Sequence, residues 1–281
     1  MQYKLICIDM DGTLLNSRHK VSEASKTAIK KAHEMGVHIV ISTGRMYTDA
    51  AYFSELIGVK SPVIASNGAL IKEKDKDDII YKSVMESSVT FEILDILAEY
   101  DLRPIFYTPE KAYFGSFADK LFFEYARLTG IISKSADLIY VKSIKQWHDI
   151  FEKEESNIIK CELMYRDIHR IRNIRDKLLK NDEIELSSSS KYNIEINCKG
   201  VSKGKAVEVL ADYLNIKRNE IIAIGDSEND LSMIAYAGMG VAMGNAIDQV
   251  KLKAKFVTDT NDNDGVAKAI NELILIPNKN G

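Results

Sequence analysis

Short apolar runs alternate with longer stretches that carry apolar residues at helical spacing, and this alternation is the strongest constraint on the fold. Apolar runs occupy residues 5–8, 37–41 and 221–224. The stretch 22–35 has the helical pattern, with a candidate N-cap at Ser22 and a glycine, Gly36, where the helix would end. Strands that alternate with helices form βαβ units, so the sequence predicts an α/β protein with a mainly parallel sheet.

The middle of the chain departs from this pattern. Residues 83–190 contain many aromatics and few of the Asp and Gly residues that flank the apolar runs elsewhere. We interpret them as an inserted α+β domain, which leaves residues 1–82 and 191–281 as a divided core that includes a strand near 194–196. The charged run 72–78 predicts the solvated tip of a hairpin.

Composition excludes several classes of protein. With 46% hydrophobic residues, 28% charged residues and a net charge of −3, the chain is globular and has no electrostatic reason to bind nucleic acid or an anionic membrane. No apolar run approaches the roughly 18–20 residues of a membrane span, and the N-terminus lacks the pattern of a signal peptide. Three distant cysteines, Cys7, Cys161 and Cys198, predict reduced thiols in a cytoplasmic protein. The oligomeric state is left open.

The densest chemistry is Asp9-Met10-Asp11-Gly12-Thr13, directly after the first apolar run. In an extended chain the two carboxylates point the same way, with Cα atoms about 6–7 Å apart, which leaves room for a phosphoryl group. Two close carboxylates repel each other, so the pair indicates either a divalent metal site or a nucleophile beside an acid/base partner. Thr13 offers a donor to an anionic substrate. The simpler alternative is an acidic turn after a buried strand.

Three further polar clusters stand at the ends of predicted strands or the starts of helices. Ser42-Thr43-Gly44-Arg45 could bind an anion or simply cap a helix. Lys203 could bridge a phosphate and a carboxylate, or be an ordinary surface lysine. In the run 225–230, Asp226 could reach a metal while Asp230 supports it from the first helical turn. Because open α/β sheets bind ligands at the carboxyl ends of their strands, the four clusters together predict one site.

Other nucleotide and hydrolase motifs are excluded. The segment 200–205 resembles a phosphate-binding P-loop but has three residues between its glycines where four are needed. The segment 238–244 has one residue too many for a dinucleotide-binding loop and leads into a strand. The five histidines share no ligand spacing, and no serine-hydrolase GxSxG sequence is present.

With these residues in place, the chain resembles the haloacid dehalogenase-like hydrolase superfamily, and specifically its Cof-type phosphatases with a large α/β cap. Four signatures match in order: Asp9-x-Asp11-Gly12-Thr13, Thr43 in STGR, Lys203 in SKGK, and Gly225-Asp226-x-x-x-Asp230. The resemblance covers the whole chain and implies a Rossmann-like core whose inserted cap, residues 83–190, closes over the site and excludes water.

The resemblance also implies roles for individual residues. Asp9 would be the nucleophile that forms an aspartyl-phosphate, and Asp11 the acid and base. Mg²⁺ would be held by Asp9, the Asp11 backbone carbonyl and Asp226, with support from Asp230.

The remaining roles concern the substrate, which the resemblance makes a small phosphate ester. Thr43 and Lys203 would bind the phosphoryl oxygens, with Asn229 nearby. Residues that would face the substrate or the cap are Gly44, Arg45 and Asn67. Sugar phosphates are the leading substrate class, followed by phosphorylated cofactors such as pyridoxal phosphate or flavin mononucleotide.

Two other functions share this chemistry. A receiver-type phosphoacceptor domain also places an Asp, a hydroxyl, a Lys and Mg²⁺ on a parallel sheet. A phosphomutase also forms an aspartyl-phosphate. The position of Asp11, two residues after Asp9, and the large insertion favour hydrolysis over the receiver function.

Overall fold

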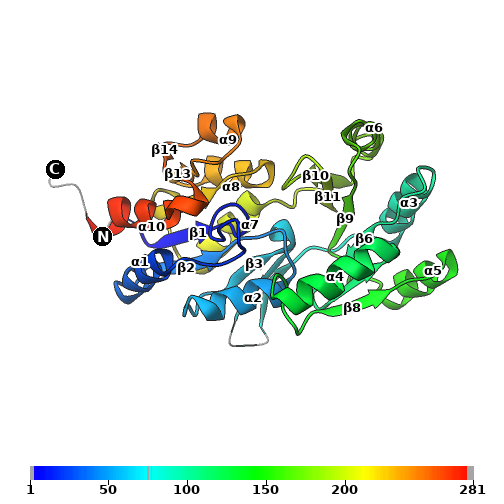
Figure 1. Ribbon diagram of the computed structural model, residues 1–281, viewed down its shortest axis with the longest axis horizontal. Helices are drawn as coiled ribbons and strands as arrows, with labels where there is room; N and C mark the ends of the chain where they lie inside the picture. The colour runs from blue at the N-terminus through cyan, green and yellow to red at the C-terminus, as the bar shows by residue number, and fades with distance from the viewer. Residues whose placement is uncertain (1–2, 75, 77, 277–281) are drawn as a thin grey trace. The chain divides into compact units, whose positions relative to one another are not determined.

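The computed structural model describes residues 3–74, 76 and 78–276, and the chain divides into two compact units (Figure 1). Unit 1 comprises residues 1–45, 50–81 and 202–281, and unit 2 comprises residues 46–49 and 82–201. Among the described residues, no helix has the length and apolar character needed to cross a membrane.

Unit 1 is built on a five-stranded parallel sheet in the order β14-β13-β12-β1-β2. The strands are β1 (Leu5–Ile8), β2 (His38–Ile41), β12 (Ile221–Gly225), β13 (Met239–Ala242) and β14 (Phe256–Val257). Strands β1 and β12 are buried along their whole length, as expected for a sheet covered on both faces. Strand β1 pairs with β12, which joins the first third of the chain to the last third (Figure 1).

The helices of unit 1 lie between these strands in the sequence or follow the last of them. They are α1 (Glu23–Glu34), α2 (Tyr47–Leu56), which begins in unit 2, α7 (Lys203–Tyr213), α8 (Leu231–Tyr236), α9 (Asp248–Lys253) and α10 (Gly265–Ile270), which continues as a π-helical turn, Asn271–Leu275. Ser22 caps α1 by accepting a hydrogen bond from the Ser25 amide, and Ser202 caps α7 through the Lys205 amide. The cap of α7 places Lys203 at the first helical position.

A separate three-stranded sheet, β3 (Val63–Ala65), β4 (Leu70–Lys72) and β5 (Ile79–Lys82), follows α2. Its first connection is a short 3₁₀ turn, Ser66–Gly68, in which Asn67 has φ of 59°. The predicted hairpin tip falls between β4 and β5, and two of its residues, Asp75 and Asp77, lie outside the described residues.

Unit 2 is a six-stranded, mostly antiparallel sheet in the order β10-β11-β9-β6-β7-β8. Its strands are β6 (Ile105–Tyr107), β7 (Lys111–Phe114), β8 (Asp137–Tyr140), β9 (Lys160–Met164), β10 (Ile184–Ser187) and β11 (Asn193–Cys198). The helices α3 (Ser87–Ala98), α5 (Ile144–Lys153) and α6 (Ile168–Leu178) share the larger apolar core with one face of the sheet. The fourth helix, α4 (Phe117–Thr129), packs with the alternate residues of β6 and β7.

The end of unit 2 differs from the boundary at residue 190 that the sequence suggests. Strand β11 pairs with β9 and β10, so residues 193–198 belong to the sheet of unit 2 and the unit extends to Val201. The expected core strand at 194–196 is therefore a strand of unit 2. Its buried apolar residues, Ile194 and Ile196, resemble those of a core strand, and pairing partners cannot be determined from that pattern.

Candidate active site

Asp9 and Asp226 follow two adjacent parallel strands and therefore lie at the same edge of the sheet. The Asp9 amide donates to the Ile224 carbonyl at 3.0 Å, which extends the β1–β12 pairing by one residue beyond Ile8. Asp9 is buried, with only 6% of its surface exposed. The parallel register thus brings together two clusters that are more than 200 positions apart in the chain.

Lys203 connects two of the carboxylates. Its Nζ lies 2.6 Å from Oδ1 of Asp9 and 2.6 Å from Oδ1 of Asp230, and the lysine is fully buried. Burial lowers the pKa of Lys203, but the charges of Asp230 and Asp9 outweigh burial and raise the pKa overall. The alternative of a surface lysine is therefore wrong.

Asp9, Asp226 and Asp230 form a cluster in which one carboxylate oxygen of each lies within 4.8 Å of the others. Burial, Asp230 and Asp226 raise the pKa of Asp9, and Lys203 opposes them. Burial and the charge of Asp230 together raise the pKa of Asp226 to about 6, against the lowering effect of the hydrogen bonds from Thr13 and Ser227. Three carboxylates face one ammonium group, and this excess of anionic oxygen fits a hard divalent cation such as Mg²⁺.

The two later aspartates have different hydrogen-bond partners. Asp230 Oδ2 accepts from the amides of Asp226 and Ser227 at 2.9 and 3.0 Å, so this side chain holds the loop that carries Asp226. Asp226 itself accepts from the hydroxyls of Thr13 and Ser227 at 2.9 and 3.0 Å. Thr13, which the sequence suggests as a donor to substrate, instead orients this carboxylate.

Asp11 lies apart from this carboxylate cluster and pairs with Arg45. The guanidinium donates to both carboxylate oxygens, from Nε at 2.7 Å and Nη2 at 2.5 Å. Burial raises the pKa of Asp11, but the charge and hydrogen bonds of Arg45 outweigh burial and lower the pKa overall. The sequence places Arg45 toward the substrate or the cap and does not predict this ion pair.

The loop after β2 and the turn after β3 are joined by backbone hydrogen bonds. The Asn67 amide donates to the Thr43 carbonyl at 3.0 Å, and the Ser66 amide donates to the Arg45 carbonyl at 2.9 Å. Asn229 Nδ2 donates to Asn67 Oδ1 at 3.2 Å, which joins this turn to the loop after β12. These hydrogen bonds bring together Thr43, Asn67 and Asn229. Gly44 lies between Thr43 and Arg45 in the loop after β2.

Two further residues support the site and were not singled out from the sequence. Ser227 donates to Asp226, as described above, and Asn245 Nδ2 donates to the Gly12 carbonyl at 2.8 Å. Asn245 follows Gly244 in a turn after β13, and a Gly-Asn turn is too common to identify such a role from sequence.

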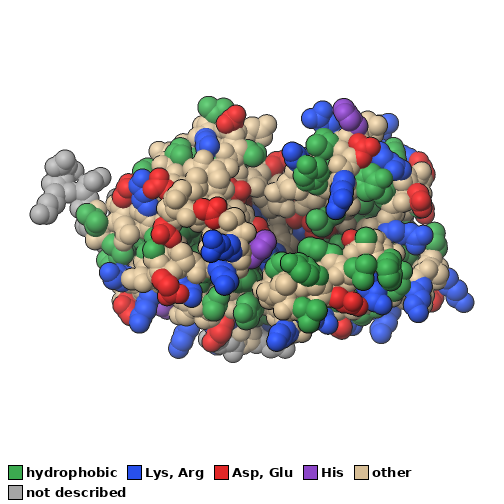
Figure 2. Space-filling view, viewed as in Figure 1, with side chains coloured by type: hydrophobic (Ala, Val, Ile, Leu, Met, Phe, Trp, Pro, Cys, Tyr) green, Lys and Arg blue, Asp and Glu red, His purple; other side chains and the backbone are tan. Residues whose placement is uncertain are grey.

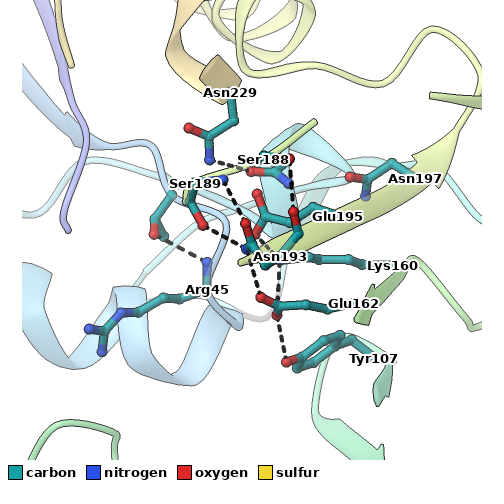
Figure 3. A network of polar contacts seen from close by, with 12 residues as sticks. Arg45, Tyr107, Lys160, Glu162, Ser188, Ser189, Asn193, Glu195, Asn197 and Asn229 are labelled. Carbon is teal, nitrogen blue, oxygen red and sulfur yellow. Dashed lines mark hydrogen bonds and ion pairs between the residues drawn. The ribbon is translucent and has the colours of Figure 1, made fainter. Parts of the chain in front are cut away.

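A second polar cluster belongs to unit 2 (Figure 3). Lys160 Nζ lies 2.6 Å from Glu195 Oε1 and 3.5 Å from Glu162 Oε2, and Lys160 and Glu195 are each 2% exposed. Glu162 also accepts from the Tyr107 hydroxyl at 3.0 Å and from Asn193 at 3.1 Å. Lys160 is thus a buried member of an ion-pair network.

The comparison with known proteins decides the family. A family model described as haloacid dehalogenase-like hydrolase matches residues 6–270. The chain belongs to this family. The sequence-based prediction of a haloacid dehalogenase-like hydrolase is therefore confirmed.

Relatives of this haloacid dehalogenase-like hydrolase carry phosphatase names. The 5-amino-6-(5-phospho-D-ribitylamino)uracil phosphatase YcsE of Bacillus subtilis is 32% identical, and the match covers 97% of this chain and 96% of the relative. The putative phosphatase YxeH of the same organism is 36% identical, with 97% and 99% covered. These relatives confirm the predicted class of enzyme, a phosphatase.

Solved structures confirm the predicted fold class. A haloacid dehalogenase-like hydrolase from B. subtilis has a TM-score of 0.86 at 31% identity, covering 96% of this chain and 100% of the other. A sugar phosphatase of subclass IIB shares the fold with a TM-score of 0.80 at 22% identity, covering 95% and 97%.

Proposed function

We propose that this enzyme hydrolyses small phosphomonoesters with Mg²⁺, through an aspartyl-phosphate on Asp9. The observation that carries the proposal is the grouping of Asp9, Lys203, Asp226 and Asp230 at one edge of the sheet of unit 1. The carboxylates of this group repel a phosphate dianion. Asp9 can therefore react with the phosphate only when positive charge, from Lys203 and a bound cation, offsets that repulsion.

Asp9 supplies the nucleophile in the first step. One of its carboxylate oxygens attacks phosphorus, the bond between phosphorus and the ester oxygen breaks, and the alcohol leaves. Lys203 holds the Asp9 carboxylate in place through its 2.6 Å contact and offsets part of the charge of the phosphoryl group. Thr43 and Asn229 are assigned to the phosphoryl oxygens, and the hydrogen bonds of Asn67 fix the loops that carry them.

Asp11 supplies the proton. It protonates the leaving alcohol and then accepts a proton from the water that attacks the aspartyl-phosphate, which releases phosphate and restores Asp9. For Asp11 to act in this way, its bidentate contact with Arg45 has to open or to share the carboxylate with the substrate. Arg45 then has a guanidinium available for an anionic or polar group of the ester.

Mg²⁺ fits the carboxylate cluster. We assign Asp9, Asp226 and the backbone carbonyl of Asp11 as its ligands, with Asp230 holding the Asp226 loop through two amide hydrogen bonds. Bound there, the cation would supply charge neutralisation between the carboxylates and the phosphate.

The proposed substrates are sugar phosphates or phosphorylated cofactors. One relative with 32% identity is named for a ribityl phosphate, 5-amino-6-(5-phospho-D-ribitylamino)uracil, and a structural neighbour is titled a sugar phosphatase. Both names describe a phosphate on a hydroxylated carbon chain, which supports the same class here. We assign the catalytic steps to unit 1 and propose that unit 2 is the inserted cap.

The test combines turnover with detection of the intermediate. Purified enzyme should release phosphate from a chromogenic ester over many turnovers, and activity should stop in EDTA and return with added Mg²⁺. Acid quenching followed by borohydride should convert residue 9 to homoserine, detected by peptide mass spectrometry. Asp9→Asn should abolish both the turnover and the homoserine.

The outcomes distinguish the alternatives. A single long-lived phosphoryl group per chain without turnover would indicate a receiver-type domain. Movement of phosphate between positions of a sugar phosphate, without phosphate release, would indicate a mutase. Strong turnover by Asp9→Asn would overturn the assignment of the nucleophile.

A further inference from the structure

Helix α4 exposes a continuous row of large apolar side chains. Phe117, Leu121, Tyr125 and Leu128 follow one another at spacings of three or four residues, so they share one face of the helix. They are 62%, 53%, 59% and 86% exposed, and the adjacent Phe122 is 47% exposed. We call these five residues the α4 stripe. Figure 2 shows hydrophobic side chains gathered over this helix.

The stripe is not needed to fold unit 2, because α4 already has a separate buried face. Phe123 and Ala126 are 9% and 0% exposed, and the Phe123 ring lies 5.0 Å from the Phe114 ring of β7. On the helical wheel these two residues point away from the row formed by Phe117, Leu121, Tyr125 and Leu128. The helix is therefore apolar on two opposite faces, and among the described residues of unit 2 the face with Phe123 and Ala126 is the one that packs against the sheet.

The exposed area is large for a protein surface. A large aromatic side chain has about 150–250 Å² to bury, so five side chains at these exposures offer roughly 600 Å². A contiguous patch of that size is at the upper end of what monomeric proteins show and marks an interaction site. Two such patches together amount to about 1,200 Å², which reaches the lower end of the range for specific interfaces.

We propose that the α4 stripe is a homodimer interface, in which α4 of one copy packs antiparallel against α4 of a second copy. The arrangement of the stripe is self-complementary. A twofold axis near Phe122 would place Phe117 opposite Leu128 of the second copy and Leu121 opposite its Tyr125. Each copy would thus contribute the same surface, as a closed twofold interface requires.

The charges beside the stripe favour the same arrangement. Lys120 and Glu124 lie on one flank of it, one helical turn apart. In an antiparallel pair equal flanks meet, so the same axis would bring Lys120 of each copy next to Glu124 of the other, giving two opposite-charge pairs. In a parallel pair opposite flanks meet, so Lys120 and Glu124 of one copy would not face each other's counterparts in the other copy. The charge pattern therefore specifies a second copy of this chain, in the antiparallel sense, as the occupant.

The oligomeric state tests this proposal. Sedimentation velocity of the full chain, from about 1 to 100 µM, should show a concentration-dependent dimer, as a modest interface predicts. Leu121→Glu should weaken association about 100-fold, because it places two carboxylates in the centre of the apolar contact. The matched control is Leu252→Glu, since Leu252 is 87% exposed on α9 in unit 1 and should leave the dimer unchanged.

Charge reversal tests the antiparallel register. Lys120→Glu alone should weaken the dimer, and combining it with Glu124→Lys should restore the association. All variants should keep the wild-type circular dichroism spectrum, which separates loss of the interface from loss of folding. A wild-type chain that stays monomeric at 100 µM, or a dimer that persists in Leu121→Glu, would overturn the proposal.

Discussion

The Nζ atom of Lys203 lies 2.6 Å from Oδ1 of Asp9, although 194 positions separate the two residues. The contact depends on β1 standing next to β12, since α7 and the loop after β12 come from the last third of the chain. The same ammonium reaches Asp230, so one side chain connects the loops that follow β1 and β12. The carboxylate cluster therefore assembles only when the two halves of unit 1 have folded together.

Replacing Lys203 should destabilise the protein in a way that a divalent cation partly reverses. Lys203→Met leaves three neighbouring carboxylates without their ammonium partner, and removing one partner of a buried ion pair costs about 3–5 kcal/mol. Thermal unfolding should show a lower melting temperature than the wild type, and Mg²⁺ should raise it more in the variant. Lys205→Met is the control, because Lys205 is half exposed and pairs with Glu208. Equal melting temperatures for Lys203→Met and the control would contradict this.

Removing Arg45 should change the pH dependence of activity. The guanidinium lowers the pKa of Asp11, which keeps this carboxyl ionised, whereas its proposed role as an acid requires a proton. Arg45→Ala should raise the pKa of Asp11, so that this carboxyl keeps its proton to higher pH. The alkaline limb of the pH profile, on which activity falls as Asp11 loses its proton, should therefore move to higher pH. Arg45→Lys keeps the charge but loses the bidentate geometry and should give a smaller shift. The measurement is kcat/KM against pH, and an unmoved alkaline limb in Arg45→Ala would contradict the coupling.

Much of this site follows from strand ends. Asp9 and Asp226 each come after an apolar run, and parallel pairing brings such positions to one edge of the sheet, so their proximity could be predicted. The partners of Arg45 and Thr13 could not, because the path of a loop decides which side chains meet. Asp11 and Arg45 are 34 positions apart in two different loops, and no spacing rule connects them.

The limits of unit 2 show a different difficulty. Strand β11 carries buried Ile194 and Ile196, a pattern that suits the parallel core as well as the sheet in which it lies. Lys160 and Glu195 are charged residues of the adjacent strands β9 and β11, yet each is only 2% exposed, and the two form an ion pair. Burial of a charge depends on its partner, and the partner is distant in sequence.

Gly12 should be required for a functional Asp226. Its φ is +77°, and a Cβ built there would lie 2.6 Å from Asp226 Oδ2, which would force this carboxylate to move. Gly12→Ala should therefore raise the Mg²⁺ concentration needed for half-maximal activity by about tenfold or more, as for a misplaced metal ligand.

Gly36 offers the matched control for that substitution. It has φ of +86°, and nothing lies within 4 Å of a Cβ built there. Gly36→Ala carries the same backbone strain, about 1–2 kcal/mol, without the collision. Both variants should lose thermal stability, whereas only Gly12→Ala should change the Mg²⁺ dependence. A similar change in Gly36→Ala would show that backbone strain alone is responsible.

Glu154 should stabilise unit 2 in a pH-dependent way. It accepts hydrogen bonds from Tyr113 at 2.5 Å, Asn157 at 2.8 Å and Lys111 at 3.0 Å. Burial raises the pKa of Glu154, but these hydrogen bonds and the Lys111 charge outweigh it and lower the pKa to about 2, from an ordinary value of 4.5. Because the folded pKa is depressed, the contribution to stability is fully present above pH 4.5 and is lost as the pH falls toward 2.

Glu154→Gln should thus lower the free energy of unfolding by about 1–3 kcal/mol at pH 7, and the difference from wild type should begin to shrink below pH 4.5. Trp147, the one tryptophan of the chain, is buried in α5 and reports on unit 2, so urea unfolding followed by its fluorescence at pH 7 and pH 4 is the measurement. Glu155→Gln, at the exposed neighbouring position, is the control and should match the wild type. A pH-independent difference for Glu154→Gln would mean that its hydrogen bonds do not depend on ionisation, since protonation would then cost the wild type nothing.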